Sequence, residues 1–193
     1  MKNFYLNFDM NKEDGKTIDF IEELSKLENS SDLVPYKFKP IANIYIDCVG
    51  GENRMAALLY SFLTLSEYHY HFIINGCVSS NALLILIALN PKYVTVMRQS
   101  SSTVHLSNYN IPVSNIALND LDHPSLYEYN DFKSYLNTLI EVYEFFLSKE
   151  EIEIIKKGED IILSASKINN LFSELKKNND FQLKSKNIFE ITL

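Results

Sequence analysis

The sequence predicts an α/β fold in which the strands form a parallel sheet. Three observations lead to this prediction: strand-like segments alternate with helical ones, residues 41–47 are rich in β-branched residues, and residues 16–27 repeat apolar positions at helical spacing. Parallel strands joined through helices need right-handed crossovers, which produce layered α/β folds. The chain has 193 residues, 46% of them hydrophobic, and no Pro/Gly/Ser-rich linker divides it. We therefore expect a single domain over residues 1–193.

The N-terminal part predicts two strands, each followed by a helix. Residues 4–8 form a short strand closed by a polar turn, and residues 16–27 follow as an amphipathic helix. After a loop with two prolines, residues 41–47 read as a buried strand that stops at Gly50-Gly51. A helix is expected at about 53–65.

The centre of the chain continues the alternation. Residues 70–74 predict a strand, and Asn75-Gly76 is a typical turn dipeptide. The apolar stretch behind it predicts a helix over residues 80–89. Two further strands are expected at 93–97 and 103–106.

The C-terminal part predicts mostly helix. A long amphipathic helix is expected at about 126–147, with apolar positions at helical spacing along one side. Residues 149–177 read as helical with a break near Gly158, and residues 187–193 as a last strand.

Composition narrows the function classes. The net charge of −7 and the lack of a basic cluster argue against nucleic acid as a primary partner. Cys48 and Cys77 are the only cysteines and form no CxxC pair, which predicts a reduced, cytoplasmic setting without a zinc site. The longest apolar run, residues 82–89, is too short to cross a bilayer, and no signal-peptide core follows the N-terminus. We expect no membrane association, no metal and no cofactor.

Ser80 stands where a polar turn meets the apolar stretch at 82–89. The first N–H groups of a helix have no helical partner, and the helix dipole favours negative charge beside them. A serine there therefore has an oxyanion site next to it, although serine is also a common helix cap. Ser79 is the alternative if the helix begins one residue earlier.

Gly50-Gly51 follows a buried strand, at the edge of the sheet where α/β folds place their ligands. Adjacent glycines let the backbone approach a substrate closely. With the Asn81 amide, this turn could present two N–H groups to one carbonyl oxygen. By itself, a Gly-Gly pair after a strand indicates only a turn.

A serine nucleophile needs a base, and the chain has four histidines. His69 and His71 flank the start of a strand, and His123 lies in a predicted loop. His105 lies in the predicted strand 103–106, on the face opposite its apolar neighbours. Periodicity alone also fits a packed or exposed strand residue.

The order of these motifs resembles the proteolytic subunit of the Clp protease, the ClpP family of the crotonase-like clan. The stretch "YIDCVGGENRMAALLYSFL" is similar to the family's strand, Ser-Pro-Gly-Gly and helix, and "GCVSSNALLILIA" to its Gly-x-Ala-x-Ser-Met-Gly-Ala segment. His105 follows Ser80 at the separation at which the family's base follows its nucleophile. "GEDIILSASKINNL" is similar to the segment around the catalytic aspartate, which corresponds to Asp160. The resemblance covers nearly the whole chain.

The resemblance implies a spiral of β-β-α units with a protruding handle helix at about 126–147. It also implies a serine endopeptidase with a Ser80–His105–Asp160 triad and an oxyanion hole formed by the amides of Gly51, or Gly50, and Asn81. Unfolded polypeptides or short peptides would be cleaved inside a homo-oligomeric ring, with stacked heptamers as one arrangement. An AAA+ unfoldase is a conceivable partner, but we expect the family's N-terminal axial loop to be absent.

Three further departures from the family pattern lie near the expected site. Val49 replaces the proline before Gly-Gly, Asn81-Ala82 replaces Met-Gly after the serine, and Leu106-Ser107 replaces Gln-Pro after the histidine. All three triad residues remain, which favours an active enzyme.

Two alternatives stay open. The first is a catalytically inactive, ring-forming member of the same fold, for which the changes at Asn81 and Leu106-Ser107 are the main support. The second is an acyl-CoA enzyme of the crotonase type. Those enzymes usually work with carboxylates, and Glu52 is the only acidic residue close to the predicted oxyanion glycines.

Overall fold

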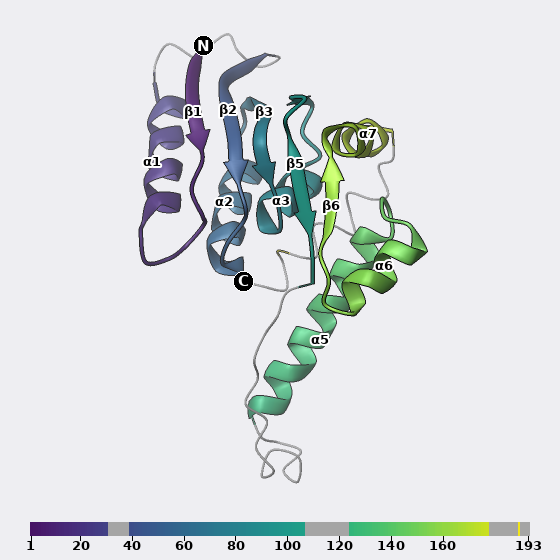
Figure 1. Cartoon of the computed structure of the whole chain (residues 1–193). Coiled ribbons are helices and arrows are strands. Elements are labelled where there is room, and N and C mark those ends of the chain that lie inside the picture. Colours follow the sequence, from purple (N-terminus) through teal and green to yellow (C-terminus); the bar gives the residue numbers. More distant parts are fainter. Residues whose placement is uncertain (31–38, 107–123, 178–188, 190–193) are drawn as a thin grey trace.

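The predicted α/β class is confirmed by the computed structural model, which describes residues 1–30, 39–106, 124–177 and 189, with the side chains of 124–132 excepted. The described residues form six strands and six helices around one sheet (Figure 1). In chain order these are β1 (Lys2–Leu6), α1 (Lys16–Glu28), β2 (Pro40–Cys48), α2 (Asn53–Leu65), β3 (His69–Val78), α3 (Asn81–Leu89), β4 (Tyr93–Val96), β5 (Ser101–Val104), α5 (Pro124–Tyr143), α6 (Lys149–Lys156), β6 (Ile161–Ser164) and α7 (Ala165–Leu175).

The sheet has the order β1-β2-β3-β5-β6, and β4 pairs with the first part of β3. The pairs among β1 to β4 and the β3–β5 pair are parallel, as predicted. The β5–β6 pair is antiparallel, so the expectation of a wholly parallel sheet was wrong at this edge. β6 itself lies inside 149–177, which the sequence predicted to be helical with one break. Four residues are too few to show the period of a strand.

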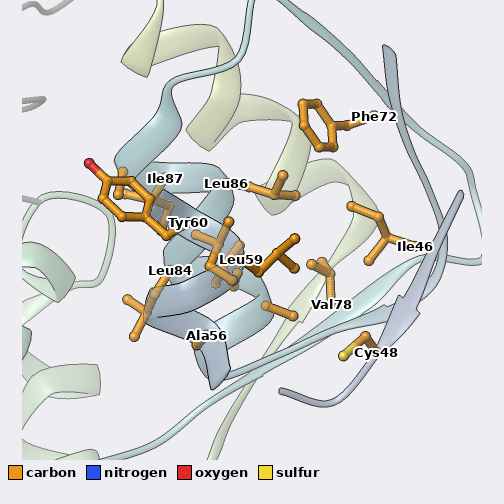
Figure 2. Close-up of a cluster of buried hydrophobic side chains, with 14 of the residues drawn as sticks. Ile46, Cys48, Ala56, Leu59, Tyr60, Phe72, Val78, Leu84, Leu86 and Ile87 are labelled. Carbon is orange, nitrogen blue, oxygen red and sulfur yellow. The ribbon is translucent and has the colours of Figure 1, made fainter. Parts of the chain in front are cut away.

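The hydrophobic core lies between the sheet and the helices α1, α2 and α3, and it continues into buried residues of α5, α6 and α7. Phe4 of β1 contacts the ring of Phe20 in α1, which fixes the first helix on this face. Figure 2 shows the central part, where side chains of β2 and β3 face those of α2 and α3. α3 is buried along nearly its whole length, which explains why its sequence is apolar on every side. The buried residues labelled in Figure 2 are Ile46, Cys48, Ala56, Leu59, Tyr60, Phe72, Val78, Leu84, Leu86 and Ile87.

The opposite face of β1 to β4 is not covered by these three helices. A row of paired residues crosses it: Tyr5 lies beside Tyr45, Tyr45 beside Ile73, and Ile73 beside Thr95. The rings of Tyr5 and Tyr45 stack at 5.3 Å, and Tyr5 is 55% exposed. Parallel sheets are normally covered on both faces, so this half-open face is unusual.

β3 is longer than predicted and contains Asn75-Gly76, so the turn expected at this dipeptide was wrong. Ile46 pairs with Ile74 while Cys48 pairs with Val78, which leaves extra residues of β3 in a bulge. In the bulge, the Cys77 N–H donates to Asp47 Oδ1 at 2.7 Å. A Cβ at Gly76 would lie 2.3 Å from that carboxylate. The chain therefore turns only at Ser79 and Ser80.

α5 agrees with the long helix predicted at about 126–147, and residues 144–147 form a turn behind it. In Figure 1 the N-terminal part of α5 extends beyond the carboxyl ends of the strands β1, β2, β3 and β5. The strand predicted at 187–193 lies outside the described residues, except for Phe189, whose backbone is helical. Within the described residues, no helix is both long and apolar enough to span a membrane.

The buried thiol of Cys48 predicts a loss of stability in alkaline solution. Burial raises the pKa of this thiol from 9.0 to about 11. The folded state therefore favours the neutral thiol, and its advantage is lost as the pH rises above the pKa of the unfolded chain. We expect this to lower the free energy of unfolding by about 1.3 kcal/mol between about pH 8 and pH 10.

The measurement is guanidinium unfolding of the reduced protein at several pH values, compared with Cys48→Ala. The stability difference between the two proteins should shrink by the expected amount over this range. A constant difference would show that the Cys48 thiol does not titrate differently on folding.

Candidate active site

Ser80 occupies a sharp bend between the end of β3 and the start of α3. Its backbone angles are φ 49° and ψ −130°, and Asn90 is the only other described non-glycine residue with positive φ. Ser80 is at the N-cap position, yet its hydroxyl makes no capping hydrogen bond. The reading of Ser80 as an ordinary cap therefore loses its physical basis. Strained residues of this kind concentrate at functional sites.

Ser79 and Ser80 have different environments. Ser79 is buried, and its Oγ accepts a hydrogen bond from the Thr103 N–H at 2.6 Å and lies 2.9 Å from Cys77 Sγ. Its hydroxyl thus ties the bend to β5. Ser80 is half-buried, and its hydroxyl makes no hydrogen bond to any described residue. Of the two serines, Ser80 carries the hydroxyl that is free to react.

Gly50 lies directly against this bend. A Cβ on Gly50 would approach Ser80 Cβ to 2.8 Å and the Asn81 nitrogen to 3.0 Å. The Gly50 N–H points at the sulfur of Cys48 at 3.4 Å. Of the two glycines that the sequence left open as donors, Gly50 therefore has its N–H engaged, and its part is the close approach to Ser80.

The two peptide groups around Gly51 are almost fully hydrogen-bonded. The Gly50 carbonyl accepts from the Met10 N–H at 2.8 Å, and the Glu52 N–H donates to the Met10 carbonyl at 2.8 Å. The Gly51 carbonyl accepts from the side-chain amide of Asn81 at 2.7 Å. Among the described residues, the Gly51 N–H has no acceptor.

The Asn81 N–H is the second free donor at this place. It belongs to the first turn of α3, and no described residue accepts from it. The Asn81 side chain joins the start of α3 to the Gly51 carbonyl, and Gly50 lies against Ser80, so the glycine loop and the start of α3 meet at Ser80. Two free main-chain donors next to a serine are what an oxyanion hole requires.

His105 and Asp160 meet because β5 and β6 pair antiparallel. Val104 at the end of β5 pairs with Ile161 at the start of β6. The two residues just beyond this pair, His105 and Asp160, therefore also lie opposite one another. His105 Nδ1 is 3.7 Å from Asp160 Oδ1, which is an ion-pair distance but longer than a hydrogen bond. His105 directly follows β5, whereas the sequence placed it inside a strand.

The pairing of β3 with β5 brings His105 toward Ser80. The Ser80 N–H donates to the Thr103 carbonyl at 3.4 Å, and His105 lies two residues further along the chain. With Nδ1 turned to Asp160, Nε2 remains for the serine, as in a Ser-His-Asp triad. Neither His105 Nε2 nor the Ser80 hydroxyl makes a hydrogen bond to a described residue, so of the two contacts of a triad only the His105–Asp160 ion pair is present.

α5 contacts the backbone of His105 through Tyr143, a residue that the sequence did not single out for the site. Tyr143 is 2% exposed, and its hydroxyl donates to the His105 carbonyl at 3.2 Å. Burial raises the pKa of Tyr143, so this donor keeps its proton at neutral pH. Its place in the apolar pattern of the helix was visible in the sequence, but its partner was not.

Of the six residues that the sequence singled out for the site, Gly50, Gly51 and Asn81 lie at the Ser80 bend, and His105 lies beside Asp160. The two groups are linked through the hydrogen bond from the Ser80 N–H to the Thr103 carbonyl, and no hydrogen bond or ion pair joins Ser80 itself to His105 or Asp160. In the described part of the chain, no group of three or more His, Cys, Asp or Glu side chains could hold a metal ion. Comparisons of the sequence with protein-family models and with curated proteins gave no match.

Proposed function

We propose that the protein is a serine peptidase of the ClpP type in which Ser80 is the nucleophile. The single observation that carries the proposal is the strained bend at Ser80, whose hydroxyl makes no hydrogen bond to a described residue and whose N–H bonds to the strand that leads to His105. A strained, non-capping serine in such surroundings has no structural task to explain it. The choice of polypeptides or short peptides as substrates rests on the family resemblance.

In this proposal the roles follow the geometry. Ser80 Oγ attacks the peptide carbonyl while His105 Nε2 takes its proton, and the developing oxyanion is bound by the N–H groups of Gly51 and Asn81. Asp160 holds the imidazole with Nε2 toward the serine. His105 then returns the proton to the leaving amine, and water releases the acyl group.

We also propose that the active form is a homo-oligomer, with α5 as a handle-type helix of a β-β-α spiral. The half-open face of β1 to β4 supports an oligomer, since burial of Tyr5, 55% exposed in the single chain, would be favourable. Both cysteines are free, which agrees with a cytoplasmic setting. Sedimentation of a monomer at micromolar concentration would contradict the oligomer.

The test of the active site is labelling with a fluorophosphonate probe, which phosphonylates activated serines. We expect label on the wild type and on Ser79→Ala, and none on Ser80→Ala. His105→Ala should lower the labelling rate about a thousand-fold or more, because the serine then lacks its base. Label that persists in Ser80→Ala would refute the assignment of the nucleophile.

A second candidate is a catalytically inactive, ring-forming subunit with the same fold. The observation that favours it is the open triad, in which Nδ1 of His105 and the Asp160 carboxylate are 3.7 Å apart. This candidate predicts an assembled wild-type protein that takes no label and hydrolyses no peptide. The same labelling experiment therefore decides between the two.

A further inference from the structure

The side chain of Asn81 is a buried amide beside the proposed oxyanion site. Asn81 is 3% exposed, and its Nδ2 donates both hydrogens: one to the Gly51 carbonyl at 2.7 Å and one to Asn53 Oδ1 at 2.8 Å. An amide buried this deeply needs its partners, because an unpaired polar group inside a protein is costly. The side chain is thus fully committed to two contacts on α2 and the glycine loop.

The contact to Gly51 completes the fixing of the loop. Met10 holds the Gly50 carbonyl and the Glu52 N–H through its backbone, and Asn81 holds the Gly51 carbonyl. Without Asn81, the peptide between Gly51 and Glu52 would be held at one end only. The direction of the neighbouring Gly51 N–H depends on how that glycine is fixed.

The contact to Asn53 extends the chain of hydrogen bonds to α5. Asn53 Oδ1 accepts from Asn81 and also lies 3.4 Å from the hydroxyl of Tyr135 on α5. Tyr135 is 5% exposed, so its place relative to α2 is set by packing. The bonded series runs from Tyr135 through Asn53 and Asn81 to the Gly51 carbonyl.

We propose that Asn81 is a positioning residue for the oxyanion site: its side-chain amide, anchored by Asn53 and Tyr135, fixes the Gly51 loop so that the Gly51 and Asn81 N–H groups point at the same oxygen. This rests on the proposed function. The main-chain N–H of Asn81 would donate to the oxyanion directly, whereas the Asn81 side chain would act through Gly51. The role belongs to this chain, because the family pattern has methionine at this place.

The experiment measures the rate constant and the final extent of fluorophosphonate labelling for Asn81→Leu. A displaced N–H group weakens stabilisation of the tetrahedral centre, so we expect the maximal rate constant to fall about ten- to hundred-fold. The extent of labelling should stay complete and the probe's half-saturating concentration unchanged. A variant that is merely partly unfolded would show a lower extent with the wild-type rate constant.

Asn43→Leu is the matched control. Its amide also donates to one side-chain partner, Asn3 Oδ1 at 2.9 Å, but it lies on the half-open face of the sheet, away from Ser80. We expect its labelling rate to equal that of the wild type. Asn53→Ala and Tyr135→Phe form a graded series in which the loss should decrease with distance from Gly51.

The outcomes separate this inference from the proposed function. Absence of label on the wild type overturns the proposed function and this role of Asn81 with it. Labelling of Asn81→Leu at the wild-type rate constant overturns the positioning role alone. If Asn81→Leu does not fold, Asn53→Ala decides, and a wild-type rate constant in that variant overturns the proposal.

Discussion

Replacing Ser80 by glycine is expected to abolish labelling and, at the same time, to stabilise the protein relative to Ser80→Ala. At φ 49° and ψ −130° the Cβ of residue 80 is strained, and holding a non-glycine residue in such a region costs about 1–3 kcal/mol. Glycine removes that strain, although it gives the unfolded chain about 0.4–1 kcal/mol more entropy. We expect a net gain of about 1 kcal/mol over Ser80→Ala.

The comparison with Ser80→Ala is needed because both variants lack the hydroxyl and only one keeps the Cβ. Chemical unfolding followed by circular dichroism gives the two free energies, and the probe gives the activity. Equal stability of the two variants would show that the bend at residue 80 carries no strain. Label on Ser80→Gly would remove Ser80 from the role of nucleophile.

A stability difference of this size would show that the native protein is less stable because the backbone of Ser80 is strained, and that this strain sets the position of the Ser80 hydroxyl. An ordinary helix start with Ser80 in an extended conformation would let the hydroxyl cap α3 and would be more stable. In the bend, the hydroxyl makes no capping bond and has no hydrogen-bond partner among the described residues. Such a conflict between local preference and observed geometry is expected at functional sites.

The sequence predicted the parts of the fold that carry strong periodicity. The apolar run of β2, the helical spacing in α1 and the wholly apolar α3 each indicate one kind of element, and their alternation gives the parallel sheet. β6 was missed because its four residues continue the polar and apolar mixture of α6. Its strand state comes from pairing with β5, which is a tertiary effect that local patterns do not contain.

The sequence also did not predict that β3 continues through Asn75-Gly76, because this extension depends on a tertiary contact as well. The dipeptide has the local preference of a turn, but Asp47 accepts the Cys77 N–H and stabilises a bulged strand instead. Gly76 is needed there for the space that the carboxylate takes, not for turning the chain.

The candidate site was predictable as a set of positions but not as a geometry. The order of the glycines, Ser80, His105 and Asp160 along the chain carried the resemblance, whereas the conformation of Ser80 depends on Gly50 packing against it. Tyr143, Tyr135 and Asn53 reach the site through single hydrogen bonds, so nothing in their sequence neighbourhood marks them. The apolar positions at helical spacing in α5 indicate a buried face, but they do not show which residues that face contacts.

Replacing Gly51 by alanine is expected to produce the largest loss of stability of any change discussed. Gly51 has φ 142°, and an added Cβ would lie 2.5 Å from the Met10 carbonyl oxygen and 2.6 Å from the Met10 nitrogen. These are backbone atoms of a fully buried residue, and both are hydrogen-bonded to the glycine turn, so Met10 cannot withdraw without breaking those bonds. Strain in φ and overpacking together suggest a loss of about 4 kcal/mol.

Gly158→Ala is the control that separates the clash from the backbone angle. Gly158 also has positive φ, 84°, but an added Cβ there would meet no atom within 4 Å. We expect it to lose about 1–2 kcal/mol, the cost of the left-handed conformation alone. Thermal and guanidinium unfolding of both variants measures the difference. A Gly51→Ala protein as stable as Gly158→Ala would mean that the loop moves away from Met10 at little cost, and an oxyanion donor on so loose a loop would not be pre-organised.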